Sequence, residues 1–297
     1  MKIAICFSGH VRTGRHAIPN ILRFIGDLRP QVDIYVHTWD HSIQKRTNSR
    51  EARTPERLSH CDRSAMMEGY GPVSMEVDDY LRTIRTLAEA RSIEVGAAMT
   101  DQIWDQAAIP MLDFNAMFYS WHRSVMMMAG SGRTYDAVVR LRPDVVYAPV
   151  TTLRSLIDDH SGDRDAFWAS MADDTRIDDV VFVSSPSTMV AMSTLWDVKC
   201  GRRQAGVHRE YMLLQHARTL GVRSQQLTRC FYAPFRDESV GRDPINGFTE
   251  IYLDDLRLYA HAYQVDGCPS TFDEWLAHAR KNGHLMRFEK LISPAVP

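Results

Sequence analysis

Short apolar runs alternate with polar, glycine-containing stretches along much of the chain, which is the pattern of buried strands joined to helices. The opening run at residues 3–7 leads into a Ser-Gly-His loop, and apolar positions then recur at helical spacing over residues 17–28. A second run, residues 32–40, completes a strand, helix, strand unit, for which a right-handed crossover is expected. The pattern predicts an α/β fold with parallel strands.

The remaining periodic segments extend this prediction to a single large domain over residues 1–250. Further strands are predicted at residues 135–144 and 176–185, and further helices at 77–91, 113–129 and 206–221. Residues 41–72, rich in Arg, Glu, Ser and Thr, are interpreted as a polar excursion that acts as a lid. Residues 251–297 are predicted to form a helical C-terminal extension, because Thr271 and Glu274 fit a capping box before an apolar pattern.

The strand at residues 135–144 ends in two arginines and a carboxylate, Arg140, Arg142 and Asp144, with Pro143 interrupting regular pairing. Ligands of open α/β sheets bind outside the carboxyl ends of the strands. Arginines suit phosphates, and an aspartate suits a metal or a sugar hydroxyl. The alternative is a local Arg–Asp ion pair at the surface.

Three other strand boundaries carry polar side chains that suit the same ligand. Ser8, Gly9 and Arg12 follow the first strand and fit an anion beside a helix start. His37 and Asp40 end the second strand. Two further carboxylates, Asp178 and Asp179, directly precede an apolar strand. Such a pair binds metal or sugar hydroxyls or acts as a base, or else forms a turn with an Asx hydrogen bond.

The order of these segments resembles GT-A-type glycosyltransferases, closest to uncharacterised bacterial and viral polysaccharide-biosynthesis members. The resemblance is carried by four segments between residues 2 and 221: IAICFSGHVR, VDIYVHTW, YDAVVRLRPD and DDVVFVS. It implies a Rossmann-type mixed sheet flanked by helices, with a helical C-terminal extension. It also implies a nucleotide-diphosphate sugar donor and a glycan or lipid-linked glycan acceptor, in cell-surface polysaccharide synthesis.

The resemblance also suggests roles for individual residues. It places helix 113–129 against the donor, with Asn115 and Tyr119 as contacts. An Asp-x-Asp motif holds Mg²⁺ or Mn²⁺ in the family, but here the matching triplet, residues 142–144, keeps only the second acid. Asp144 is then the metal ligand, or arginines neutralise the phosphates instead.

Three carboxylates are candidates for the catalytic base, Asp178, Asp179 and Glu210. The family often places an acid at the start of a late helix, which is the position of Glu210. A helix N-terminus stabilises a carboxylate and weakens it as a base, so Asp179 is favoured over Glu210.

The amino-acid composition limits which partners and which cellular location are expected for this protein. The net charge of −2 gives no support for a nucleic-acid partner. Five cysteines without a Cys-x-x-Cys pair favour reduced thiols and a cytoplasmic protein. The absence of a long apolar run or a signal-peptide pattern predicts no transmembrane segment, so a lipid-linked acceptor at the inner membrane would be reached by peripheral contact.

Two other readings of this sequence stay open. A sulfotransferase-like enzyme also begins with strand, phosphate loop and helix, although it gives no special reason for Asp144 or for the two adjacent aspartates. The other reading is a catalytically degenerate protein that binds a nucleotide or a glycan without turnover, which the incomplete Asp-x-Asp motif favours.

Overall fold

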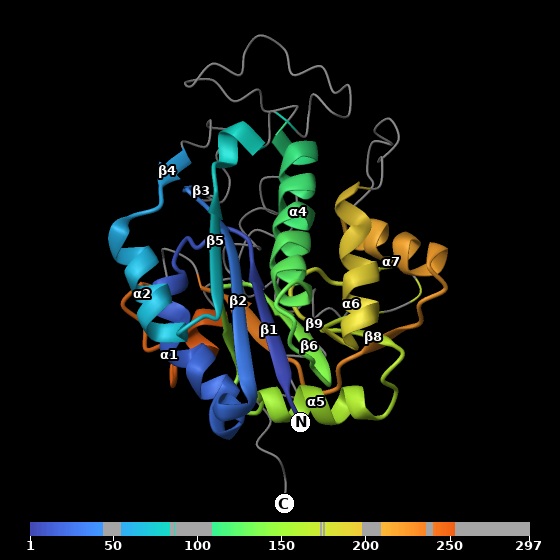
Figure 1. Cartoon of the computed structure of the whole chain (residues 1–297). Helices are drawn as coiled ribbons and strands as arrows, with labels where there is room; N and C mark the ends of the chain where they lie inside the picture. Colours follow the sequence, from blue (N-terminus) through green and yellow to red (C-terminus); the bar gives the residue numbers. More distant parts are fainter. Residues whose placement is uncertain are drawn as a thin grey trace, which may run out of the picture.

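A seven-stranded mixed sheet lies at the centre of the computed structural model, which describes residues 1–43, 55–83, 86, 109–172, 174, 176–197, 209–235 and 240–252. The strands follow the order β10-β8-β9-β6-β1-β2-β5 (Figure 1). Their bounds are β1 Ile3–Ser8, β2 Val32–Trp39, β5 Ser74–Asp78, β6 Ala137–Leu141, β8 Phe167–Ala169, β9 Phe182–Ser184 and β10 Ser224–Gln226. Among them β9 runs antiparallel to both neighbours, and the other pairs are parallel. The predicted α/β fold with a mixed sheet is confirmed.

Helices cover both faces of this sheet (Figure 1). One face carries α1 Gly14–Ile25, α2 His60–Tyr70 and α5 Leu153–Ser161, and the other carries α4 Ile109–Ala129, α6 Pro186–Ser193 and α7 Arg209–Thr219. Alternate residues of β1 serve the two apolar layers. Ile3, Ile5 and Phe7 pack with α1, whereas Ala4 and Cys6 pack with α4. Burial on both faces explains why β1 is a continuous apolar run in the sequence.

Local signals set where several helices begin and end. The side chain of Ser185 accepts a hydrogen bond from the Thr188 amide at 3.3 Å, and Pro186 follows as the first residue of α6. Gly26, with a φ of 55°, ends α1, and a 3₁₀ helix, η1 Gly26–Gln31, leads into β2. A second 3₁₀ helix, η2 Thr194–Asp197, follows α6. Two small antiparallel sheets, β3 His41–Ile43 with β4 Pro55–Arg57 and β7 Val145–Tyr147 with β11 Tyr232–Pro234, lie outside the main sheet.

The structure differs from the sequence prediction in two segments. Val77 and Asp78, expected in a helix, belong to the edge strand β5, and helical structure begins only at Tyr80. Within residues 41–72, expected to be a polar excursion, residues 60–70 form α2, which buries Met66 and Tyr70 against α1. The rest of that segment includes residues 44–54, which lie outside the described residues, as does the extension from residue 253 onward.

Among the described residues, no helix combines the length and the apolar character that a membrane span requires.

Candidate functional site

The predicted site residues meet at the edge of the sheet where the parallel strands end. Pairing of β1 with β2 sets Ser8 beside His37, and pairing of β1 with β6 sets Cys6 beside Arg140. Because β9 is antiparallel, its first residue, Phe182, pairs with Arg140 near the end of β6. The residues that precede β9 therefore lie at the same edge as the residues that follow β1 and β6.

Asp144 lies at the centre of a cluster of charges at this edge. Its carboxylate accepts two hydrogen bonds from Arg142, from Nε to Oδ1 at 2.9 Å and from Nη2 to Oδ2 at 2.7 Å. Arg12 Nη1 donates to the same Oδ2 at 3.0 Å. Asp144 is only 3% exposed. Burial alone would lower the pKa of Arg142, but the charge and hydrogen bonds of Asp144 outweigh burial and raise it.

Three chain segments hold this charged cluster in place. The Phe235 amide, just after β11, donates to the Asp144 carbonyl at 2.9 Å, and the Thr13 hydroxyl donates to the Phe235 carbonyl. A Cβ at Gly14 would lie 3.0 Å from the Pro143 carbonyl oxygen, so a larger residue would require α1 or the turn to shift. Arg12 has a φ of 45°, an uncommon conformation for a residue other than glycine. Such strain often accompanies functional positions.

Arg140, the other expected phosphate ligand, is built into the fold and does not face the edge. The side chain is 1% exposed. Its Nε donates to Ser8 Oγ at 2.9 Å, and Nη1 donates to the carbonyls of Asp179 and Val180. The guanidinium lies 5.3 Å from the centre of the Phe182 ring. Burial lowers the pKa of Arg140 to about 10. Arg140 and Ser8 thus fix the backbone that carries the paired aspartates.

The paired aspartates are both buried and differ in their surroundings. Asp178 Oδ2 accepts hydrogen bonds from Ser170 Oγ at 2.8 Å and from the Tyr232 hydroxyl, and its Oδ1 accepts from the Asp179 amide at 2.7 Å. Burial, together with the negative charge of Asp179, raises the pKa of Asp178. The charge of Asp179 also favours the protonated forms of Arg140 and Arg142. Asp178 is thus fixed in position by its hydrogen bonds, and the neighbouring carboxylate of Asp179 lies near the arginine side chains.

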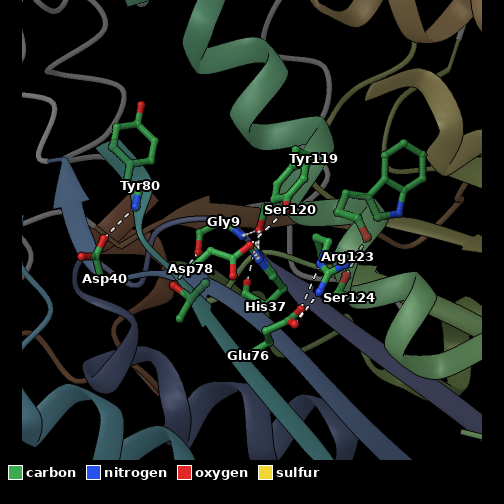
Figure 2. Close-up of polar contacts among 12 residues, drawn as sticks. Gly9, His37, Asp40, Glu76, Asp78, Tyr80, Tyr119, Ser120, Arg123 and Ser124 are labelled. Carbon is green, nitrogen blue, oxygen red and sulfur yellow. Dashed lines mark hydrogen bonds and ion pairs between the residues drawn. The ribbon is translucent and has the colours of Figure 1, made fainter. Parts of the chain in front are cut away.

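A chain of hydrogen bonds runs from the loop after β1 into α4 and β5 (Figure 2). The Gly9 amide donates to Ser120 Oγ at 2.8 Å, and Ser120 Oγ also contacts His37 Nδ1 at 2.8 Å. His37 Nε2 contacts Asp78 Oδ2 at 3.1 Å, and the Tyr119 hydroxyl donates to the same oxygen. His37 is fully buried, so it connects strands rather than facing a ligand.

The Gly9 carbonyl is also engaged, because Thr38 Oγ1 donates to it at 2.9 Å. Both backbone groups of Gly9 are therefore hydrogen-bonded within the protein, where they fix the loop. Asp40 is likewise structural here, since its Oδ1 accepts the Tyr80 amide at 2.8 Å and contacts His41.

Two further predicted residues lie on the helices α4 and α7. Asn115 lies in α4, within the part of that helix of which only the backbone is described. Glu210 is the second residue of α7, and its carbonyl accepts the Ile177 amide at 3.0 Å, directly before Asp178. The backbone of Glu210 is thus close in the fold to the paired aspartates.

Three side chains at this edge were not predicted: Asp78, Ser170 and Tyr232. Asp78 ends a segment, Ser-Met-Glu-Val-Asp, in which polar and apolar residues alternate. That alternation is the signal of a half-exposed strand and could have identified β5. Ser170 and Tyr232 carry no comparable signal, because only the fold brings them to Asp178.

The residues at Asp144 do not fit Mg²⁺ or Mn²⁺. Both oxygens of its carboxylate already accept guanidinium hydrogen bonds, and a metal ligand must offer such an oxygen to the ion. In the described part of the chain, no group of three or more His, Cys, Asp or Glu side chains is arranged to hold a metal ion.

No family model matches this chain, and no curated protein matches it. Solved structures resemble it distantly. The apo glycosyltransferase GlyE of Streptococcus pneumoniae TIGR4 has a TM-score of 0.38 and 11% identity, over 75% of this chain and 44% of that one. The chain thus matches less than half the length of GlyE.

Two further solved structures resemble this chain to a similar degree. The galactosyltransferase LgtC, in complex with donor and acceptor sugar analogues, has a TM-score of 0.38 and 12% identity, over 75% of this chain and 73% of that one. A putative glucose-1-phosphate thymidylyltransferase from Bacillus anthracis has a TM-score of 0.39 and 10% identity, over 82% of this chain and 94% of that one. At these identities and TM-scores the likenesses carry no argument about the chemistry of this chain.

Proposed function

We propose that this chain is a glycosyltransferase that moves a sugar from a nucleotide-diphosphate donor to a glycan acceptor. The observation that supports it most is the meeting, at one edge of the sheet, of an arginine cluster with a pair of buried aspartates. Arg12 and Arg142 supply positive charge for a diphosphate, and Asp179, held beside Asp178, supplies a carboxylate for an acceptor hydroxyl.

The donor diphosphate binds beside Arg12, Arg142 and the start of α1. No acidic residue lies in the first turn of α1, so the partial positive charge of that helix end adds to the attraction. The hydrogen bond from the Gly9 amide to Ser120 keeps the loop between β1 and α1 in one conformation. A loop that is ordered before binding loses less entropy when the ligand arrives.

Asp179 acts as the base. It takes the proton from the acceptor hydroxyl, and the hydroxyl oxygen then forms a bond to the anomeric carbon of the donor sugar. The bond from that carbon to the diphosphate breaks, and the electron pair leaves with the diphosphate, whose charge the arginines stabilise. Asp178 is a positioning residue, because the three hydrogen bonds to its carboxylate hold it and the Asp179 backbone together.

The acceptor is a glycan or a lipid-linked glycan of cell-surface polysaccharide synthesis, reached by peripheral contact at the cytoplasmic side of the inner membrane. This part of the proposal rests on the resemblance of the four sequence segments, and no contact among the described residues bears on it.

A panel of nucleotides tests the proposal. Thermal unfolding would be followed with UDP, GDP, CMP and adenosine 3′,5′-bisphosphate, and then hydrolysis or transfer would be measured with the matching nucleotide sugars. We expect stabilisation by a sugar-carrier nucleotide and turnover of its sugar conjugate. Stabilisation by the bisphosphate alone would identify a sulfotransferase-like enzyme. Nucleotide binding without turnover across donors and acceptors would identify a binding protein.

A further inference from the structure

The position where a metal ligand is expected is instead occupied by an ion-paired carboxylate. Asp144 is 3% exposed and lies between two guanidiniums, with one from the same turn and one from the loop after β1. Arg142 approaches it in a two-bond fork, the geometry that best matches a carboxylate. A carboxylate paired with two guanidiniums has its negative charge already compensated, so it offers a divalent ion little net attraction.

The positive charges around Asp144 also disfavour a bound metal ion. A divalent cation bound to Asp144 would lie within a few ångströms of two positively charged side chains, and like charges repel strongly in a buried site. A diphosphate, in contrast, would be attracted by both. Arg142 uses Nε and Nη2 for Asp144, which leaves the N–H groups of Nη1 for a ligand, and its side chain retains 16% exposure.

The backbone at Arg12 provides a second observation. Its φ of 45° is a conformation that favours glycine, yet an arginine occupies it and reaches Asp144 across 132 residues of sequence. Backbone strain of this kind persists where the surrounding structure enforces it. Here the Thr13 contact with Phe235 and the close approach of Gly14 to Pro143 hold the flanking residues.

We infer that the donor diphosphate is bound by Arg12 and Arg142 without a divalent cation, and that Asp144 is a positioning residue that orients both guanidiniums. This inference rests on the proposed function for the identity of the ligand. It assigns to the arginines the charge neutralisation that an ion would otherwise supply, and it removes Asp144 from direct contact with the ligand.

Calorimetric titration with UDP, GDP and inorganic pyrophosphate, in EDTA and in Mg²⁺ or Mn²⁺, tests the inference. We expect at least one probe to bind in EDTA with an affinity within about twofold of that in the metal. Asp144→Asn should weaken binding in EDTA by about tenfold to hundredfold, although it removes a negative charge. That sign is diagnostic, because a carboxylate that only repelled the anion would give tighter binding on neutralisation.

A metal-ligand role for Asp144 gives a different pattern. Binding would then require the metal, and Asp144→Asn would abolish the effect of the metal while leaving the affinity in EDTA unchanged or higher. Either result overturns the inference, and so does failure of all three probes to bind in EDTA. Nucleotide binding that depends on metal would overturn the metal-free site but preserve the proposed function. Pyrophosphate binding in EDTA without nucleotide binding would preserve the metal-free site but overturn the proposed function.

Two further variants guard against trivial loss of structure. Arg142→Lys keeps the charge but loses the fork, and it should lower affinity in EDTA even if Asp144→Asn does not fold. Asp27→Asn is the matched control, because Asp27 pairs with Arg154 at 2.7 Å in η1, at the opposite edge of the sheet. Asp27→Asn should leave all affinities unchanged, and circular dichroism would confirm that each variant is folded.

Discussion

The backbone at Gly14 approaches Pro143 so closely that a Cβ at residue 14 would lie 3.0 Å from the Pro143 carbonyl oxygen. This contact joins the first residue of α1 to the turn that carries Asp144. The distance between Arg12 and Asp144 therefore depends on a position that makes no hydrogen bond to either.

Gly14→Ala should lower the free energy of unfolding by about 1–3 kcal/mol, because the backbone carbonyl must move to admit the new methyl group. Helix propensity alone predicts the opposite, a gain of up to about 1 kcal/mol for alanine. Nucleotide affinity should fall as well, since the turn shifts. Urea unfolding and calorimetry measure the two effects.

Gly132→Ala provides the comparison. Gly132 has a φ of 69°, and a Cβ added there would have no other atom within 4 Å, so alanine at this position meets conformational strain only. It should destabilise without changing affinity. A Gly14→Ala protein that is more stable than the original and binds normally would contradict the contact.

Ser120→Ala should loosen the loop after β1. The change removes the acceptor of the Gly9 amide and the partner of His37 Nδ1, and unmet buried groups cost about 1–3 kcal/mol. Ser124 is the control, because it is equally buried one turn along α4 but its hydroxyl donates only to the Trp121 carbonyl at 2.8 Å (Figure 2). Ser124→Ala should cost about 1 kcal/mol or less.

Hydrogen exchange at the Gly9 amide distinguishes these two serines. Exchange should accelerate in Ser120→Ala and stay unchanged in Ser124→Ala. Equal protection of the Gly9 amide in both variants would show that the loop is held by other contacts.

Arg140→Met should act on stability and not on ligand binding. Loss of the guanidinium leaves the carbonyls of Asp179 and Val180 without this donor, and we expect a cost of about 2–5 kcal/mol. Arg133→Met, at a surface ion pair with Asp33, should change stability much less than Arg140→Met. A folded, stable Arg140→Met protein with no nucleotide affinity would instead place Arg140 in direct contact with the ligand.

Asp179→Asn should reduce the transfer rate about 10²- to 10⁴-fold with donor affinity nearly unchanged. The substitution keeps the backbone carbonyl that Arg140 contacts, so the fold should be preserved. Glu210→Gln is the matched variant at the competing carboxylate. Normal turnover in Asp179→Asn with loss in Glu210→Gln would assign the base to Glu210, and full activity in both would indicate a mechanism without a dedicated base.

Stability should fall as the pH is lowered from about 7.5 to about 5, with His160 as one cause. His160 is 2% exposed, and among the described residues neither ring nitrogen has a hydrogen-bond partner. Burial, assisted by the positive charge of Arg164, lowers the pKa of His160. Below its unfolded value of about 6.5, the unfolded chain binds a proton that the folded chain does not, which favours unfolding.

Urea unfolding at several pH values measures this effect. His160→Leu should show a shallower loss of stability than the original protein over the same range. The comparison of the two proteins is needed because Asp178, whose pKa is raised by burial and by Asp179, changes stability in the opposite direction. Identical slopes for the two proteins would exclude His160 as a contributor.

Local patterns in the sequence were sufficient to predict the elements that are buried on both faces. The runs that became β1, β2, β6 and β9 are rich in apolar residues and almost wholly buried because helices cover both sides of the sheet, and α4 shows a long helical stripe. The half-exposed edge strand β5 was missed, because its last two residues, Val77 and Asp78, were assigned to a helix that includes Tyr80 and Leu81. An edge strand has one neighbour and a weaker apolar signal.

The sequence by itself determined which strand ends carry the polar side chains of the candidate site, because strand direction places every carboxyl end of parallel neighbours at one edge. Only the tertiary structure decided what each side chain does there. Arg140 and Arg142 are two residues apart, yet the first is buried under β9 and the second leaves the sheet with the turn. The second arginine bound to Asp144, Arg12, is 132 residues distant in sequence, and the order of strands in the sheet, which no local pattern encodes, brings the two together.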